Sequence, residues 1–150
     1  MKNVFKINDS NEIINRINNL TPSTQGRWGK MTVAQMLAHC NVTYELVYTD
    51  KHPKPSGLMK FILKFMVKQS VVGEKPYKKN MRTGPQFLVA EDKNFEEEKQ
   101  RLIDYITKTQ ELGEGHFDNK ESHSFGKLKK DEWNNLFYKH LNHHLSQFGV

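Results

Sequence analysis

Three of the seven histidines lie within five positions near the C-terminus, in the stretch KHLNHHLSQFG (residues 139–149). On a helical wheel that starts at Trp133, His140 falls at about 340° and His144 at about 20°, both inside the apolar arc. His143 falls near 280°, at the edge of that arc. Burying an unpaired polar group costs about 1–3 kcal/mol, so the two inward-facing imidazoles require a partner in the interior.

A metal ion is one such partner. Two histidines at positions i and i+4 of a helix can direct their nitrogens at one ion, about 2.0–2.1 Å from each. The pair alone leaves open whether these side chains are ligands or hydrogen-bonded core residues. A third candidate is His39, which lies at the border of the apolar face of the helix predicted for residues 31–50 and suits a ligand or a rim residue equally. The adjacent Cys40 faces the core and is expected to be a small buried apolar side chain.

The elements that must position these histidines are predicted to be helical. A capping-box spacing of Asp9 and Glu12 predicts a first helix that runs to about Leu20, with an apolar stripe. The same spacing of Thr32 and Gln35 begins the helix that carries His39. Two further helices are predicted from acidic first turns, apolar periodicity and a C-terminal glycine. The first spans residues 94–113, with Gly113 as its C-cap, and the second spans residues 129–149, with Gly149 as its C-cap candidate.

The rest of the chain contains no convincing pair of strands, although QFLVA (residues 86–90) could form a short extended piece. Residues 114–127 are predicted to be a loop. A length of 150 residues is typical of one domain. The sequence therefore predicts a single all-α domain over residues 1–150, a bundle of four main helices with an additional helix or insertion.

The additional segment, GLMKFILKFMVKQ (residues 57–69), carries three lysines four residues apart on an otherwise apolar helix. They are Lys60, Lys64 and Lys68. We expect the apolar face to pack on the bundle or to form a homodimer contact, with the lysines reaching outward. The surrounding residues 51–82 hold nine Lys or Arg against one Glu, a balance of +8 within a chain of net charge +6. This charge run is expected to be a solvated face, which could also meet an anionic partner.

Other classes of protein are disfavoured. No apolar run approaches the roughly 18 residues that a membrane span requires, and the polar N-terminus lacks the apolar region of a secretory signal. The single cysteine, Cys40, cannot form an internal disulfide and suits a reducing compartment, so a cytoplasmic location is expected. No recognised reader motif indicates nucleic-acid binding.

The phrases WGKMTVAQMLAHC and HLNHHLSQF together resemble the DinB-like (DinB/YfiT) superfamily of four-helix-bundle metalloenzymes, over nearly the whole chain. The phrases HSFGKLKKDEW and KHLNHHLSQFG look like one bacterial subfamily of it, a domain of unknown function. In the superfamily one histidine of the second helix and two of the last main helix, four residues apart, hold the metal. These positions match His39, His140 and His144 here, and Gln147 matches a glutamine that often follows.

Three neutral imidazoles leave zinc or nickel with an open position, which is the mark of a catalytic site, and the ion can make hydroxide or thiolate available at neutral pH. The superfamily includes transferases and isomerases that use a low-molecular-weight thiol, so the resemblance implies a thiol-dependent transferase, with a metal-assisted hydrolase as the other enzymatic reading. His123 is a weaker candidate at the pocket mouth, as a substrate contact or proton carrier. Glu45 and Glu132 are expected to be solvated.

Two alternatives remain open. The same pocket could hold a metal or small ligand without catalysis, as a sensor or scavenger. A third reading is a peripheral membrane or nucleic-acid binder that acts through residues 51–82, and the apolar character of residues 57–69 makes packing the preferred interpretation over membrane contact. The sequence does not decide the role of His143.

Overall fold

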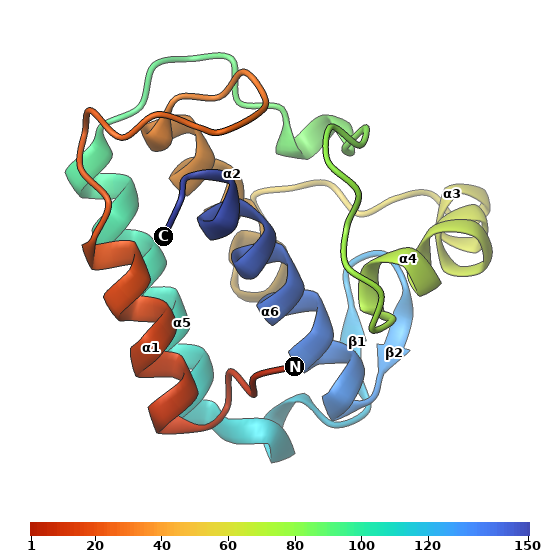
Figure 1. Ribbon diagram of the computed structural model, residues 1–150. Helices are drawn as coiled ribbons and strands as arrows, with labels where there is room; N and C mark the ends of the chain where they lie inside the picture. The colour runs from red at the N-terminus through yellow and green to blue at the C-terminus, as the bar shows by residue number, and fades with distance from the viewer.

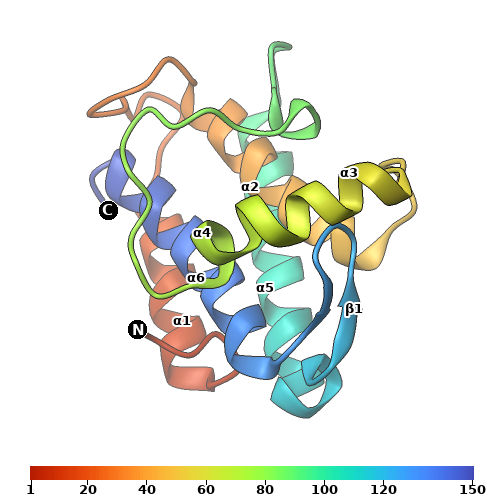
Figure 2. The ribbon, with the colours of Figure 1, turned by 90° about the vertical axis from the view of Figure 1, so that its right-hand side faces the viewer.

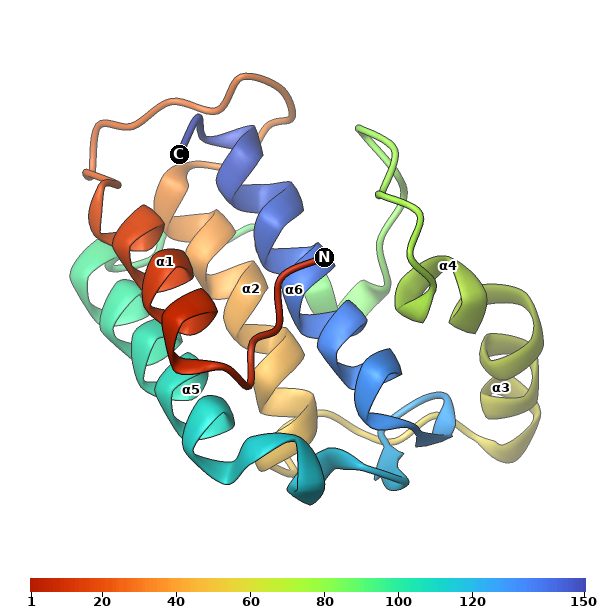
Figure 3. The same cartoon turned by 60° about the horizontal axis from the view of Figure 1, so that its bottom comes forward.

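The computed structural model describes all 150 residues and is mostly helical (Figure 1). This agrees with the all-α prediction at the level of fold class. Four long helices form the main part of the molecule, and Figure 3 shows them side by side. Helix α5 contacts α1 and α2, and α6 contacts α1, α2 and α5. The four are α1 (Ile7–Asn18), α2 (Val33–Tyr48), α5 (Phe95–Phe117) and α6 (Lys130–Gln147).

One cluster of 22 buried apolar residues fills the space between these helices. The predicted stripe of the first helix, Ile13, Ile17 and Leu20, is part of that cluster and is almost completely buried. Helix α6 contributes Trp133 and Phe137, whose rings stack with centroids 5.5 Å apart. The side of α6 on which the wheel places two histidines is therefore the side that faces the core.

The start of α2 is predicted correctly. The Thr32 hydroxyl accepts a hydrogen bond from the Gln35 backbone N–H at 3.2 Å, and the Gln35 side chain accepts one from the Thr32 N–H at 3.0 Å. The predicted start of α1 at Asp9 is wrong, because the helix begins at Ile7. The Asp9 carboxylate instead accepts from the Asn3 N–H at 2.7 Å, which ties down the segment that precedes the helix.

The two predicted C-terminal glycines behave differently. Gly149 follows α6 with φ +83°, as expected for a helix end. Gly113 also has a positive φ, +72°, but the helical chain continues beyond it to Phe117 as a kinked last turn. Phe117 is fully buried, so the extra turn adds an aromatic side chain to the core that the predicted end at Gly113 would have excluded.

Two short strands were not predicted. β1 (Lys120–Ser122) and β2 (Gly126–Leu128) form an antiparallel hairpin in which Lys120 pairs with Leu128. The Ser122 hydroxyl donates to the Gly126 carbonyl at 2.7 Å and accepts from the Phe125 N–H at 2.9 Å, which closes the turn. Strands of three residues are too short to show an alternating pattern in the sequence. The segment QFLVA forms no strand, and its start lies in the 3₁₀ turn η2 (Pro85–Phe87).

The lysine-bearing segment is helical, but its apolar face does not pack on the bundle and two of its lysines do not point outward; the alternative of a homodimer contact stays a prediction. The segment comprises α3 (Gly57–Ile62), the π-helical η1 (Leu63–Val67) and α4 (Lys68–Val72), and it crosses one side of the molecule (Figure 2). Lys60 pairs with Glu121 at 2.6 Å and Lys68 with Glu132 at 2.8 Å, so these lysines face the body of the protein. The large apolar side chains face solvent, while the hairpin and the start of α6 offer carboxylates. No helix combines the length and hydropathy that crossing a bilayer requires.

Candidate metal centre

The structure brings the three predicted histidines together in the interior. His39 comes from α2, and His140 and His144 lie one turn apart on α6. Each offers a ring nitrogen, and these nitrogens all lie within 4.8 Å of one another. The closest pair is His39 Nε2 and His140 Nε2, at 3.0 Å. Contact between α2 and α6 therefore completes a cluster that neither helix forms alone.

His39 is oriented by main chain from a distant part of the sequence. Its Nδ1 lies 2.8 Å from the carbonyl oxygen of Phe87, in η2. A carbonyl only accepts hydrogen bonds, so the ring proton is on Nδ1. The lone pair of Nε2 then points toward His140. Hydrogen bonding of the outer nitrogen to a carbonyl is the usual way in which proteins orient a metal-binding histidine.

His144 is oriented by a short relay. Its Nδ1–H donates to Gln147 Oε1 at 2.8 Å, and the Gln147 amide N–H donates to the Trp28 carbonyl at 2.6 Å. The Trp28 carbonyl must receive an N–H, which fixes the orientation of the amide and hence the proton position on His144. Gly29 makes room for this contact: its φ is +82°, and a Cβ there would lie 2.5 Å from Gln147 Nε2.

His140 has a partner of a different kind. Its Nδ1 lies 2.9 Å from the Thr43 hydroxyl, which can donate or accept. When the hydroxyl donates, the proton of His140 is on Nε2 and can bridge the 3.0 Å to His39. When the hydroxyl accepts, the proton is on Nδ1, and all three Nε2 lone pairs face the centre of the cluster. Thr43 thus allows His140 to match either arrangement without moving.

The cluster is electrically neutral at pH 7. Burial lowers the pKa of His39, lowers that of His140 well below 6.5, and lowers that of His144 to about 3. For His140 and His144, a charge on the neighbouring imidazoles would lower the pKa further. No carboxylate hydrogen-bonds to any of the three rings, so their nitrogens remain available as bases.

Access to the cluster is uneven. His39 and His144 expose only 5% and 7% of their surface, whereas His140 is half-buried. The Phe87 ring packs against His39 and His140, with centroids 5.3 and 5.8 Å away. Phe87 therefore covers part of the site in addition to orienting His39. His140 is therefore the least covered residue of the three.

His143 lies outside the cluster, as the wheel indicates. Its ring makes edge contacts with Trp28 and Tyr77, at centroid distances of 5.9 and 5.7 Å. Together with these aromatic residues it lines a separate cavity of about 240 Å³. Although His143 adjoins His144 in the sequence, it faces a different environment.

Other candidates are placed away from the three histidines. His123 contacts Ser124 and the His52 carbonyl at the hairpin turn, and nothing links it to the cluster. Cys40 is buried, as predicted, and burial raises the pKa of its thiol. The expectation that Glu45 is solvated is wrong: the residue is 3% exposed and bonds to Lys51, His52 and Arg101.

Sequence reasoning missed Thr43 and Phe87. Thr43 stands four residues after His39 on α2, so its place on the same face could have been noticed from the spacing. Phe87 carried no such signal, because its main-chain carbonyl acts across 48 positions of sequence.

These features define a mostly helical protein with a buried, outwardly hydrogen-bonded cluster of three histidines. The chain belongs to the family described as "Protein of unknown function (DUF1569)", whose sequence profile matches residues 1–149. No curated protein and no solved structure matches the chain.

Proposed function

We propose that His39, His140 and His144 hold a divalent metal ion, zinc or nickel, and that the protein is a metal-dependent enzyme of the DinB-like type. One observation carries the proposal. The three rings converge through nitrogens that can present lone pairs, while each opposite nitrogen already has an acceptor available: Phe87 O for His39, Gln147 Oε1 for His144 and the Thr43 hydroxyl for His140.

The distances suit such an ion after a small adjustment. Bonds of about 2.0–2.1 Å in a tetrahedral site separate two ligand nitrogens by about 3.3 Å. His39 and His140 are slightly closer than this, at 3.0 Å, and the remaining ligand atoms lie within 4.8 Å. Binding of an ion therefore requires the ligand atoms that are farthest apart to approach one another by less than about 1.5 Å. Neutral, buried imidazoles are the state that binding requires, since no proton must first be removed.

The DinB-like assignment is supported by the order of the helices. The ligand positions fall on the second long helix and on the last one, α2 and α6, as the resemblance implies. The contacts of α1, α5, α2 and α6 agree with a four-helix bundle to which α3, η1 and α4 are added. A cytoplasmic location belongs to the same proposal, because a free thiol substrate and the unpaired Cys40 both suit a reducing compartment.

The proposed reaction is attack of a low-molecular-weight thiol, as its thiolate, on a small electrophilic substrate, or hydrolysis of a substrate by water. When bound, a divalent ion with three neutral ligands supplies a positive centre that lowers the pKa of a fourth group. His140 is the least buried of the three proposed ligands, so we place the substrate on its side of the cluster. Phe87 excludes water from the neighbouring side, and Thr43 and Gln147 keep His140 and His144 from turning away.

A second candidate function is non-catalytic binding of a metal or small ligand, as a sensor or scavenger. The burial of His39 and His144, with Phe87 packed over the cluster, favours it, because a storage or sensing site requires no room for substrate. The two candidates share the same metal site and differ in what reaches it.

Elemental analysis of purified, untagged protein tests the shared site. We expect about one equivalent of zinc or nickel after exposure to either metal and removal of excess. His140→Ala is expected to abolish this, while His143→Ala retains it, because His143 faces the separate cavity. Absence of metal from the wild type, or equal loss in both variants, would contradict the proposal.

Activity assays separate the two candidates. A thiol with an epoxide and an activated ester are the substrates to test, with the metal-loaded wild type and His140→Ala. Turnover that disappears in His140→Ala supports an enzyme. A protein that binds metal stoichiometrically and turns over neither class of substrate is better described as a binding module.

A further inference from the structure

The outward face of α3 and η1 is unusually apolar for a surface. Six large side chains expose between 38% and 78% of their area, with Phe65 at 65% and Met66 at 78%. No residue of α3 or η1 is buried. The Phe61 and Phe65 rings contact each other, at a centroid distance of 4.5 Å, and cover no other part of the protein's core. The face, called here the outward face, consists of Leu58, Met59, Phe61, Ile62, Phe65 and Met66.

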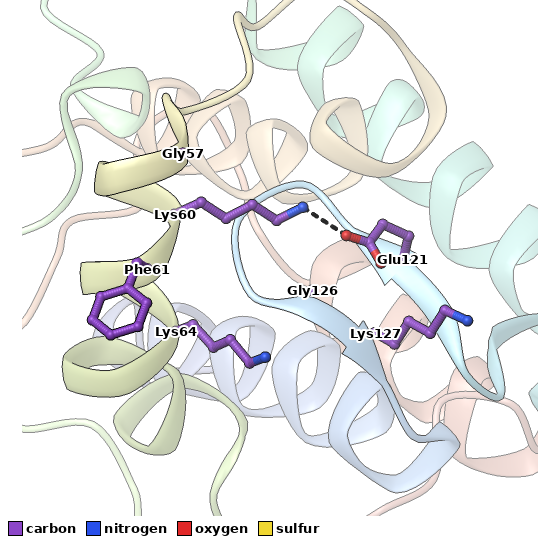
Figure 4. A pocket seen from close by; sticks show the side chains of 7 residues that line it. All are labelled: Gly57, Lys60, Phe61, Lys64, Glu121, Gly126 and Lys127. Atoms are coloured by element: carbon purple, nitrogen blue, oxygen red, sulfur yellow. Dashed lines mark hydrogen bonds and ion pairs between the residues drawn. The ribbon is translucent and has the colours of Figure 1, made fainter.

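Ion pairs lie on the side of the segment opposite this face. Lys60 bonds to Glu121 of β1 and Lys68 bonds to Glu132 of α6. Figure 4 shows Lys60 and Lys64 extending toward the hairpin, with the Phe61 ring on the other side of the helix. Ion pairs that water can reach contribute less than the burial of one large apolar side chain. The pairs therefore accompany this orientation, and covering the six apolar side chains with a partner would be favourable.

Positive charge borders the outward face. A cavity of about 480 Å³ lies between the segment and the hairpin, and Lys60, Lys64 and Lys127 line it with a single acid, Glu121 (Figure 4). Glu121 is engaged by Lys60, and Lys64 and Lys127 make no ion pair. Residues 51–82, which include Lys60 and Lys64, hold nine Lys or Arg in all against one Glu. An apolar surface with a cationic border suits a partner that is apolar inside and anionic at its edge.

We propose that the outward face binds the surface of a bilayer that contains anionic lipids. Leu58, Phe61, Phe65 and Met66 enter the boundary between headgroups and acyl chains, as amphipathic helices do when they lie in the membrane plane. Lys64 and Lys127 then lie at the level of the lipid phosphates. A second copy of this chain fits less well, because symmetric contact would bring the unpaired Lys64 and Lys127 of both copies to the same border with no carboxylate to receive them. The proposal does not depend on the histidine cluster.

Co-sedimentation with vesicles tests this binding. The untagged full-length protein is mixed with vesicles of phosphatidylcholine alone or of phosphatidylcholine with phosphatidylglycerol. We expect binding to the anionic vesicles only, and weaker binding as salt is raised. The double variant Phe61→Ser, Phe65→Ser should bind roughly a hundredfold less tightly, since each phenylalanine removed from water contributes a factor of roughly ten or more.

Matched variants distinguish binding through the outward face from non-specific hydrophobic adsorption and from binding by charge alone. Ile7→Ser removes an apolar side chain that is 54% exposed on α1, on the far side of the molecule from α3 in Figure 1, and should leave binding unchanged. Lys64→Glu with Lys127→Glu should weaken it while leaving the apolar residues in place. His140→Ala should bind as the wild type does.

Three outcomes would overturn the proposal. The first is no binding to anionic vesicles at low salt, and the second is binding that survives the double phenylalanine variant. The third is a stable dimer in lipid-free solution, seen by sedimentation equilibrium, that the same double variant converts to monomer. That result would assign the outward face to a second copy of the chain.

Discussion

Helix α2 carries two buried polar sites, His39 and, six residues later, Glu45, and their partners differ. Glu45 faces α5, and its carboxylate bonds to two cations, Lys51 and Arg101, and to the His52 ring. His39 faces α6 and is surrounded by other neutral bases, with a nitrogen of His140 at 3.0 Å. Both residues are almost completely buried, at 3% and 5% exposure.

The difference lies in what each site still requires. Around Glu45 every charge has an opposite charge, so the group is complete within the chain, and its physical effect is to join α2, α5 and the segment after α2. Around His39 the polar groups on the outside are satisfied, while those on the inside face one another. Under the proposal a cation completes the inward nitrogens of the histidine cluster, and this would distinguish it from the ion cluster around Glu45.

The substitution Glu45→Gln should have the largest effect on stability and tests whether the two sites are independent. We expect it to lower the free energy of unfolding by roughly 2 kcal/mol, less than the roughly 3–5 kcal/mol of a fully buried pair, because Arg101 can still reach water and Glu98. Metal affinity should be unchanged. Urea denaturation and a metal titration measure the two quantities. Glu91→Gln, which alters an exposed pair, is the control and should change stability by no more than about 0.5 kcal/mol. A loss of metal affinity in Glu45→Gln would show that the two sites are not independent.

Thr43→Val should have a smaller effect of the opposite kind, lowering metal affinity and not chiefly stability. It keeps the shape of the side chain but removes the partner of His140 Nδ1. We expect metal affinity to fall about tenfold, at the lower end of what loss of an outer hydrogen bond costs. Thr109→Val is the matched control, because Thr109 is also buried and hydrogen-bonded, to Tyr48, but lies away from the histidines. Equal metal affinity in the wild type and Thr43→Val would remove Thr43 from the site.

The pH dependence of stability should show two separate windows in the metal-free protein. Burial lowers the pKa values of His140 and His144 below 6.5, so below that pH the unfolded chain binds protons that the folded chain does not. Stability is therefore complete above pH 6.5 and decreases as the pH falls through that value.

Glu45 should act in the lower window. Burial alone raises the pKa of Glu45, but the hydrogen bonds from His52, Lys51 and Arg101 together lower it below 4.5. Its contribution is present above pH 4.5 and decreases at lower pH. Urea midpoints from pH 7.5 to 3.5 would show both losses, and Glu45→Gln should remove only the lower one. A midpoint that stays constant between pH 7.5 and 5.5 would contradict the neutral state of the buried histidines.

Sequence periodicity was sufficient for the part of the site that lies on regular helices. The wheel of α6 separated His140 and His144 from His143, because all three angles follow from one repeat of 3.6 residues. The wheel of α2 did not decide whether His39 is a ligand or a rim residue, because a residue at the border of the apolar face can be either until the position of the neighbouring helix is known. The resemblance to DinB-like proteins resolved that choice in favour of His39, and the structure brings His39 to the other two.

The errors occur where tertiary bonds determine the outcome. The segment of residues 57–69 was expected to pack its apolar face on the bundle or on a second copy with its lysines outward, but Glu121 and Glu132, more than 60 positions away, bind Lys60 and Lys68. Glu45 was expected to be solvated, and the partner that buries it, Arg101, is on another helix. The group of Phe87 that bonds to His39 is a main-chain carbonyl, which every residue type has, so the residue type at position 87 gave no signal. Single-element patterns contain no information about such partners.

The main-chain nature of the groups that orient His39 and Gln147 has a consequence for evolution. Replacing Phe87 or Trp28 by another residue removes a side chain but keeps the carbonyl, so point mutation cannot delete either acceptor. Insertions and deletions between α4 and α5, or between α1 and α2, shift those carbonyls along the chain and are far more damaging. Homologues that retain the site should therefore keep both loop lengths constant, and at position 87 any constraint on residue type comes from the ring that packs on His39 and His140 rather than from the carbonyl.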